Sequence, residues 1–271
     1  MNFFYLVFGV FTVLGYAQSH NNTRFVVGGF NTKIEKYPFI VQVEYYEIIL
    51  TDWRPNCAAN ILSSSWLLSA AHCYQETNYS SNNTRIRAGT THLEDGGVIH
   101  YVDFIRNHPD YGKAAKYDAD ISCLKLVTPL VFNDVIKPVH VNVIYNMLQP
   151  DAEVQYVGWG DLFVGSGEHS YVLQHVTVHI VNNTQCAERY KREYGSDVIT
   201  KNMICAGVWG LGGKDACSGD SGGPLYTNGV LYGIVSWGHF CAREDFPGIS
   251  TDVAVYADWI SNTTEVNRTM A

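Results

Sequence analysis

Beyond residue 25 the chain consists of short runs in which apolar and polar residues alternate, separated by residues typical of turns. Such runs occupy residues 39–46, 98–105, 172–181 and 231–237. A period of two predicts half-buried β-strands. Helical periodicity is scarce and is best at 253–261, where Val253, Tyr256, Ala257 and Ile260 would share one face. Repeated short strands without intervening helices predict an all-β sandwich or barrel.

The first seventeen residues have a different pattern, that of an export signal. Residues 3–14 form an apolar run that is too short to span a bilayer. Gly15 and Ala17 are small residues at the spacing that signal peptidase needs, so we predict that residues 1–17 are a signal peptide cleaved after Ala17. No later stretch is long and apolar enough for a transmembrane helix, and we therefore expect a secreted, extracellular protein with no membrane partner.

Composition and charge narrow the class. The 271 residues, 46% of them hydrophobic, suffice for one large domain or two small ones. A formal net charge of -8 argues against nucleic acid or anionic membranes as partners. Export places seven cysteines in an oxidising compartment, where six can pair and one is left over. Six sequons are glycosylation candidates, at Asn21, Asn78, Asn82, Asn182, Asn262 and Asn267.

The most specific chemical signal is Gly-Asp-Ser-Gly-Gly-Pro at 219–224. Small residues around Ser221 leave its hydroxyl uncrowded and let backbone N–H groups face a substrate carbonyl. The string also fits the Gly-x-Ser-x-Gly turn of α/β-hydrolases, in which an acid and then a histidine follow the serine. Here His239 is the only histidine after Ser221, and no acidic residue lies between them. The sequence therefore disfavours a lipase or esterase.

A serine hydroxyl needs an adjacent base to act as a nucleophile at neutral pH. His72 follows an apolar segment in Ala-Ala-His-Cys at 70–73, and Asp120 opens another in Asp-Ile at 120–121. With the string at 219–224, in that order, these motifs resemble the chymotrypsin/trypsin family of serine proteases. Gly-Trp-Gly at 158–160 and Ser-Trp-Gly at 236–238 match further family motifs, so the resemblance covers residues 26 to about 261.

The resemblance implies two antiparallel six-stranded Greek-key barrels, at about 26–140 and 141–261, with a C-terminal helix, a short tail and the active site between the barrels. By the same resemblance Ser221 is the nucleophile, His72 the general base, and Asp120 the group that orients the imidazole. The N–H groups of Gly219 and Ser221 would form the oxyanion hole. A catalytically inactive homologue that acts as a binding protein remains an alternative.

Substrate selectivity is also read from the resemblance. Asp215, six residues before the nucleophile, would lie at the base of the primary pocket and pair with substrate Arg or Lys. Gly238 and Gly248 match the glycines of the pocket walls. Phe240 and Ser250 depart from the family, which usually has glycine and tyrosine there, and Ala216 removes a hydroxyl beside Asp215. We predict an Arg-over-Lys preference and a narrowed entrance, with chymotrypsin-like specificity as the alternative.

The resemblance implies a zymogen, with residues 18–25 as the activation propeptide and 26–271 as the protease domain. Cleavage would free the amino group of Val26 to pair with Asp220. The residue before the cut is then Phe25, where the family has Arg or Lys, and Arg24 lies one position upstream. Cleavage after Phe25 keeps the register, whereas cleavage after Arg24 leaves an overhang of roughly 3.5 Å that breaks the buried pair. We favour the former.

The remaining expectations concern cysteines, metals and partners. The resemblance pairs Cys57 with Cys73, Cys186 with Cys205, and Cys217 with Cys241, leaving Cys123 as a buried thiol. His175 and His179 are four apart but lie in an alternating strand pattern, and Thr90 and Thr91 stand where vertebrate trypsins have calcium ligands. We expect no metal and no cofactor. The expected partners of this monomer are protein or peptide substrates, an activating protease and protein protease inhibitors.

Overall fold

The computed structural model describes residues 27–75, 80–145 and 147–266. The predicted signal peptide and propeptide, Val26, and the sequons at Asn21, Asn78 and Asn267 lie outside the described residues. Within these ranges no helix has both the length and the apolar character needed to cross a membrane.

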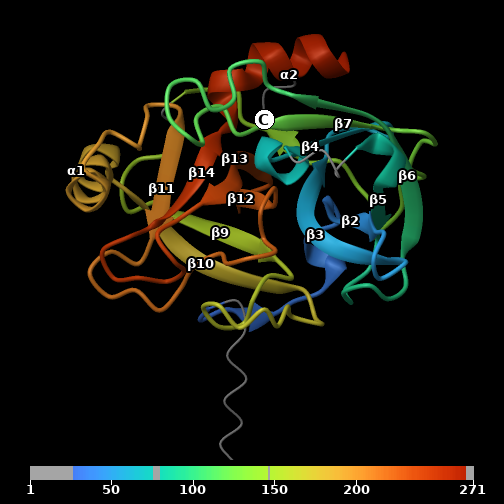
Figure 1. The fold of residues 1–271 in the computed structure, drawn as a ribbon, viewed down its shortest axis with the longest axis horizontal. Coiled ribbons are helices and arrows are strands. Elements are labelled where there is room, and N and C mark those ends of the chain that lie inside the picture. The colour runs from blue at the N-terminus through green and yellow to red at the C-terminus, as the bar shows by residue number, and fades with distance from the viewer. Residues whose placement is uncertain (1–26, 76–79, 146, 267–271) are drawn as a thin grey trace, which may run out of the picture.

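Six antiparallel strands close into a first barrel, on the right of Figure 1. In the order of their pairing they are β2 (Ile40–Glu47), β3 (Asp52–Ile61), β4 (Trp66–Ser69), β7 (Ser122–Leu126), β6 (Val98–Asn107) and β5 (Thr84–Ala88). Strand β5 shows why the sequence forms such a barrel, since Thr84, Ile86 and Ala88 are buried while Arg85 and Arg87 between them are half-buried. Glu44, on the neighbouring strand β2, accepts hydrogen bonds from both arginines.

A second barrel lies beside the first in Figure 1. Its strands are β9 (Glu153–Gly158), β10 (Gln174–Val181), β11 (Met203–Gly207), β14 (Gly248–Asp252), β13 (Val230–Trp237) and β12 (Pro224–Thr227). Strand β9 pairs with both β10 and β12, which closes the ring. The prediction of an all-β fold with two antiparallel six-stranded barrels is confirmed.

Two short strands extend the second barrel from elsewhere in the chain. Strand β1 (Phe30–Asn31) precedes the first barrel in sequence yet pairs with β10, and β8 (His140–Val141) pairs in parallel with β13. An aromatic contact and a backbone hydrogen bond also connect the two barrels directly. Phe39 stacks at 4.9 Å on Tyr226 of β12, and the Ala58 N–H donates to the Ser221 carbonyl at 2.8 Å. The two barrels therefore share a packed interface, where the catalytic motifs meet.

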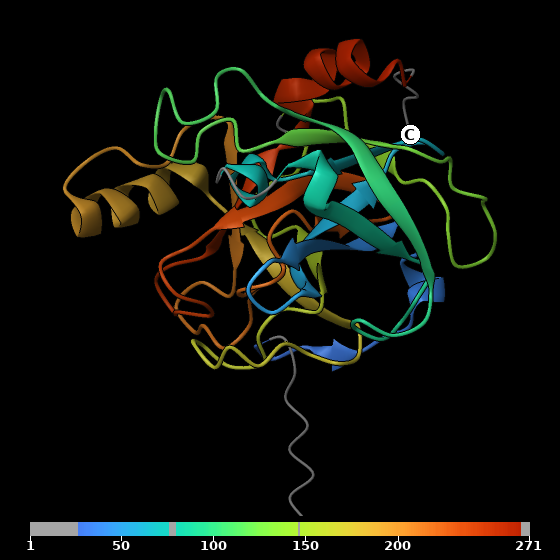
Figure 2. The same ribbon diagram turned by 45° about the vertical axis from the view of Figure 1, so that its right-hand side comes forward.

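Helices are few, as the scarcity of helical periodicity predicts. The expected helix at 253–261 forms as a 3-10 turn, η4 (Val253–Tyr256), followed by α2 (Ala257–Thr264), which lies across the top of the molecule in Figures 1 and 2. Val253, Tyr256 and Ile260 are buried in the core cluster that includes the first barrel. The other 3-10 turns are η1 (Ile34–Lys36), η2 (Ala71–Tyr74) and η3 (Ser81–Asn83).

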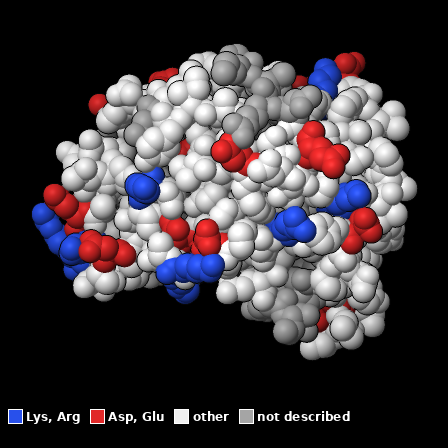
Figure 3. Space-filling view, turned by 90° about the horizontal axis from the view of Figure 1, so that it is seen from above, with Lys and Arg blue, Asp and Glu red and all other residues white. Residues whose placement is uncertain are grey.

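The longest helix, α1 (Asn183–Tyr194), was not anticipated from the sequence. It buries only Cys186 and Tyr190, four residues apart, so its apolar stripe is too narrow to stand out. Its boundaries were nevertheless readable, because the Asn182 side chain caps its first turn and Gly195 ends it in the left-handed conformation. Acidic and basic side chains intermix over this end of the molecule in Figure 3, where Arg189 and Glu193 form one of several ion pairs.

Three disulfides join Cys57 to Cys73, Cys186 to Cys205, and Cys217 to Cys241. They are the pairs that the resemblance implies. Cys123 is free and fully buried in β7, where burial raises the pKa of its thiol. It therefore packs as a small apolar residue.

Candidate active site

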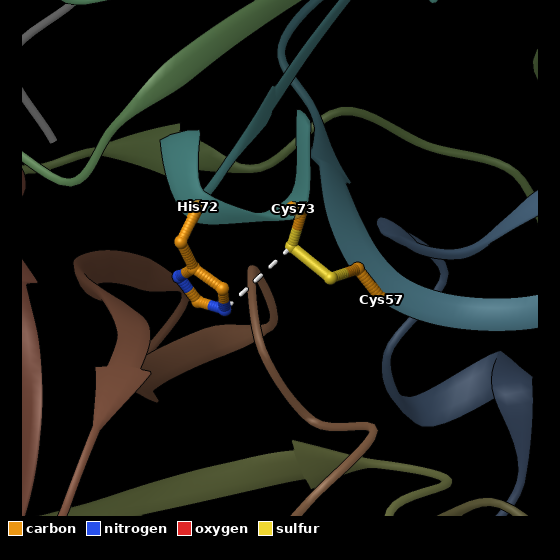
Figure 4. Close-up of side chains that lie close together, drawn as sticks. All are labelled: Cys57, His72 and Cys73. Atoms are coloured by element: carbon orange, nitrogen blue, oxygen red, sulfur yellow. Dashed lines mark hydrogen bonds between the residues drawn. A yellow bond between two sulfur atoms is a disulfide. The ribbon is translucent and has the colours of Figure 1, made fainter. Parts of the chain in front are cut away.

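His72 lies on the short turn η2, at the end of β4. The next residue, Cys73, is tied to β3 by its disulfide with Cys57, and Figure 4 shows the imidazole pointing away from this turn. The side chain keeps 21% of its surface exposed. A disulfide on the neighbouring residue thus fixes the backbone from which a partly exposed imidazole projects.

Asp120 holds the imidazole from the other side. Its carboxylate is fully buried and accepts hydrogen bonds from the His72 backbone N–H at 2.8 Å, from His72 Nδ1 at 2.7 Å, and from Ser236 Oγ at 2.5 Å. Because an ionised carboxylate only accepts, Nδ1 carries a proton and neutral His72 presents Nε2 as the acceptor. That tautomer is the one a general base needs.

The backbone around Asp120 is anchored in the second barrel. Thr251 Oγ1 on β14 donates to the Asp120 carbonyl at 2.9 Å. Two residues earlier, the buried carboxylate of Asp118 accepts hydrogen bonds from Thr200 Oγ1 at 2.5 Å and Asn202 Nδ2 at 3.0 Å. Hydrogen bonds therefore hold the segment that carries Asp120 against the second barrel.

Ser221 comes from the second half of the chain and meets the first barrel through its backbone. The following residue, Gly222, has a φ of 79°, and a Cβ there would lie 2.3 Å from both the Ala58 carbonyl and Ser69 Oγ. Glycine is required by both the conformation and the close approach. Between Ser221 Oγ and His72 Nε2 the described structure has no hydrogen bond, and in ligand-free sites such contacts are often long.

The loop before Ser221 contains the two N–H groups that the sequence predicts as an oxyanion hole. Gly219 adopts a φ of 94°, in the left-handed region that favours glycine. Neither its N–H nor that of Ser221 donates to another residue in the described ranges. Two uncommitted donors beside a nucleophile are the arrangement that stabilises a tetrahedral oxyanion.

Asp220 lies behind this loop and is 1% exposed. Its two oxygens accept from the N–H groups of Gly160 and Cys217, at 2.8 and 2.9 Å. A Cβ on Gly158 or Gly160 would lie 2.1 or 2.4 Å from the carboxylate, which explains both glycines of Gly-Trp-Gly. Burial raises the pKa of Asp220 to about 6. Its expected partner, the amino group of Val26, lies outside the described residues.

A second histidine supports the same loop, and sequence reasoning missed it. His169 Nδ1 lies 2.9 Å from the buried carboxylate of Asp161, whose N–H donates to the Ser218 carbonyl at 2.7 Å. The His169 ring lies 2.9 Å from where a Cβ on Gly219 would be. The only available signal was an acid and a histidine eight residues apart, directly after Gly-Trp-Gly.

The expected pocket residues line one cavity of about 210 Å³, together with Ser221. Asp215 is 2% exposed, and its Oδ2 accepts from the Ala242 N–H at 3.0 Å while Oδ1 has no partner among the described residues. Burial raises the pKa of Asp215 to about 8. A Cβ on Gly248 would lie 2.4 Å from Asp215 Oδ1, so that wall must be glycine. Gly238 also lines this cavity.

Phe240 lines the same cavity in an unusual backbone conformation. Its φ is 61°, in the left-handed region that favours glycine. The side chain is 63% exposed and lines the same cavity. Its aromatic surface is therefore available to contact a side chain that enters the cavity.

Among the described residues, the candidate metal ligands can be examined for their spacing and bonding. In the described ranges one cluster has suitable spacing, Cys57, His72 and Cys73, but both sulfurs are joined to each other and cannot act as thiolates. His175 and His179 lie on strand β10, as predicted, and not on a helix. His175 Nδ1 contacts the Tyr37 hydroxyl at 2.9 Å, and His179 lies 3.9 Å from Glu153.

Comparisons with known proteins agree with this geometry. The family model described as "Trypsin" matches residues 26–260. A trypsin of Phaedon cochleariae is 36% identical over 241 residues, covering 89% of both chains. "Trypsin, alkaline C" of Manduca sexta is 37% identical over 241 residues, 89% of this chain and 91% of its own. "Trypsin alpha" of Drosophila melanogaster is 37% identical over 238 residues, 88% and 87%. The chain therefore belongs to the trypsin family and is a trypsin-like serine endopeptidase.

Proposed function

We propose that this endopeptidase is secreted as a zymogen and cleaves protein substrates after Arg and, less efficiently, after Lys. The observation that carries the specificity is Asp215, a buried carboxylate with one unpartnered oxygen at the base of the cavity that Ser221 lines. A buried charge is costly unless it is paired. A substrate guanidinium supplies both the opposite charge and hydrogen-bond donors.

The mechanism assigns one step to each group. Ser221 Oγ attacks the scissile carbonyl while His72 Nε2 takes its proton, and Asp120 stabilises the resulting imidazolium through Nδ1. The N–H groups of Gly219 and Ser221 hold the oxyanion. His72 then protonates the leaving amine, which departs and leaves an acyl-enzyme on Ser221. Water, activated by the same imidazole, attacks the ester and releases the second product.

Secretion is supported by several features that point the same way. The apolar run at 3–14 has the length of a signal sequence, and three disulfides persist only in an oxidising compartment. The sequons at Asn82, Asn182 and Asn262 are exposed and thus accessible for glycosylation. Asn182 caps α1 through Oδ1, which leaves its Nδ2 free to carry a sugar.

Activation follows from the burial of Asp220, a carboxylate with two N–H donors but no cation among the described residues. An ammonium from Val26 would supply that cation after cleavage behind Phe25, by an activating protease that accepts an aromatic residue. N-terminal sequencing of active enzyme tests the assignment. Val26 is the expected first residue, and Phe25 in that place would show that cleavage follows Arg24 instead.

A cleavage profile of the activated enzyme on a peptide library tests the specificity. The expected order is Arg, then Lys, with all other residues before the scissile bond far behind. Fastest turnover after Phe or Leu would overturn the proposal in favour of chymotrypsin-like selectivity. No turnover, with intact binding of protein protease inhibitors that fit the same cleft, would support an inactive binding homologue.

A further inference from the structure

A tyrosine that sequence reasoning did not single out reaches the base of the pocket. Tyr156 lies on β9, is 1% exposed, and lines the same cavity as Asp215 and Ser221. Its ring is buried among apolar side chains of the second barrel, including Val154 and Val176. The phenol is therefore held rigidly, with its one polar atom at the edge of the pocket.

The Tyr156 hydroxyl has a single hydrogen-bond partner in the described structure, Ser250 Oγ at 3.5 Å. Ser250 lies on β14 and is fully buried, so no bulk water competes at this contact. Such a long contact leaves the phenol oxygen with an unused lone pair. Burial, and next the nearby Asp215 carboxylate, raise the pKa of Tyr156 above its usual value, so the phenol remains protonated.

The position of Gly248 shows that the Tyr156 hydroxyl and the Asp215 carboxyl group lie on the same side of the cavity wall. A Cβ placed on Gly248 would lie 3.2 Å from the Tyr156 hydroxyl and 2.4 Å from Asp215 Oδ1. The two oxygens thus flank the same point without hydrogen-bonding each other, and Asp215 Oδ1 has no partner. The space beside Gly248 is therefore bordered by two oxygens, one from a carboxyl group and one from a phenol.

We propose that Tyr156 is a specificity-determining residue of the primary pocket, whose hydroxyl and Asp215 together receive the N–H groups of a substrate arginine. The inference deepens the proposed Arg/Lys specificity and rests on it. A guanidinium presents five donors in a planar fork, so it reaches two acceptors at once. A lysine ammonium is a compact charge on a shorter side chain and pairs chiefly with Asp215. Ser250 Oγ donates to the Tyr156 hydroxyl, whose other lone pair accepts from the ligand.

The test compares Tyr156→Phe with the wild-type enzyme on matched Arg and Lys peptides. Hydrogen bonds to charged groups are the stronger class, and we expect kcat/KM for the Arg peptide to fall about tenfold. The Lys peptide should lose less than about threefold, so the Arg-to-Lys ratio falls. The substitution should likewise raise the inhibition constant of benzamidine, a planar amidinium, more than that of benzylamine, an ammonium.

Tyr37→Phe is the matched control, because Tyr37 is also 1% exposed and its hydroxyl contacts Gln155 and His175 instead of the pocket. Titration of active sites with a fluorophosphonate normalises the rates for any loss of folded enzyme. An unchanged Arg-to-Lys ratio in Tyr156→Phe, or an equal change in Tyr37→Phe, would overturn the inference.

The proposed Arg/Lys specificity and the proposed role of Tyr156 can be disproved separately. If the wild-type enzyme does not prefer basic residues, the proposed specificity itself is wrong. If it prefers them but Tyr156→Phe behaves as wild type, only the role of Tyr156 is wrong. Ser250→Ala sharpens the result, because loss of the phenol's partner should lower the ratio in the same direction by a smaller factor.

Discussion

Asp120 and Asp215 are both buried carboxylates within the same active site, but their surroundings are opposite. Asp120 accepts three hydrogen bonds from within the chain, two from His72 and one from Ser236. Asp215 has one oxygen without a hydrogen-bond partner in the described part of the chain, and burial raises its pKa to about 8. The chain itself satisfies the carboxylate of Asp120, whereas in the proposed function a substrate side chain completes the contacts of Asp215.

This difference follows from what each region must do. A general base works only if its tautomer and orientation are fixed in advance, so every contact of Asp120 is made by the protein. Selectivity instead requires that the preferred substrate side chain supply a charge or hydrogen bond that the pocket lacks and that other side chains cannot supply. The unpaired oxygen of Asp215 is that deficit, and Asp220 shows a related one that a new N-terminus would complete.

The largest effect that separates the two regions is expected from Asp120→Asn. The amide donates where the carboxylate accepts, which favours the wrong His72 tautomer, and kcat should fall about 10⁴-fold, as is known for this exchange in the family. The loss should be the same for Arg, Lys and neutral substrates. Steady-state kinetics on all three would contradict the account if only the basic substrates were affected.

Asp215→Asn should give the reverse pattern. A substrate Arg would then bury its charge unpaired, at a cost of about 3–5 kcal/mol, or roughly 10²–10⁴-fold in kcat/KM. The rate of Ser221 labelling by a small neutral fluorophosphonate should be unchanged, because the triad is intact. Equal losses in peptide turnover and in labelling would mean that Asp215 supports the whole site and not the pocket alone.

The raised pKa of Asp215 predicts a pH dependence of ligand binding. Only the ionised carboxyl pairs with benzamidine, and below about pH 8 the empty pocket holds it mainly protonated. The inhibition constant should therefore fall about tenfold per pH unit from pH 6 to 8 and level off above. In Asp215→Asn the slope should vanish, and a flat profile in the wild-type enzyme would contradict the assigned pKa.

The smallest effect is expected at the loop that carries the oxyanion donors. His169→Gln removes the partner of Asp161 and the ring that packs against Gly219, so kcat should fall about threefold to tenfold with KM nearly unchanged. His179→Gln is the control, because His179 is an exposed histidine facing Glu153 on the outside of the second barrel. Equal effects of the two substitutions would show that His169 has no specific role in supporting this loop.

Sequence and structure agree best where a motif is rigid and short. The strings around His72, Asp120 and Ser221 carried the resemblance to the chymotrypsin/trypsin family, and that resemblance implied the two barrels. Alternation along β10 also excluded a helical pair of His175 and His179. The fold class was therefore predictable before any coordinates, whereas the roles of the pocket residues stay predictions.

The partners of those residues were not predictable. Ser236 and Thr251 contact Asp120 from more than 100 positions away, and only the docking of the barrels brings them there. Alternation on β9 predicts that Tyr156 is buried, but not that its hydroxyl ends beside Asp215. Helix α1 was missed because its narrow apolar stripe carried little signal, although Asn182 and Gly195 mark its ends.

The most direct test of the central claim is covalent labelling of activated enzyme by a fluorophosphonate, with the modified residue located by mass spectrometry. The account predicts one modification, on Ser221, and its loss in His72→Ala although the serine is still present. Labelling of another residue, or labelling of Ser221 at an unchanged rate without His72, would contradict the claim that these residues form a catalytic triad with Asp120.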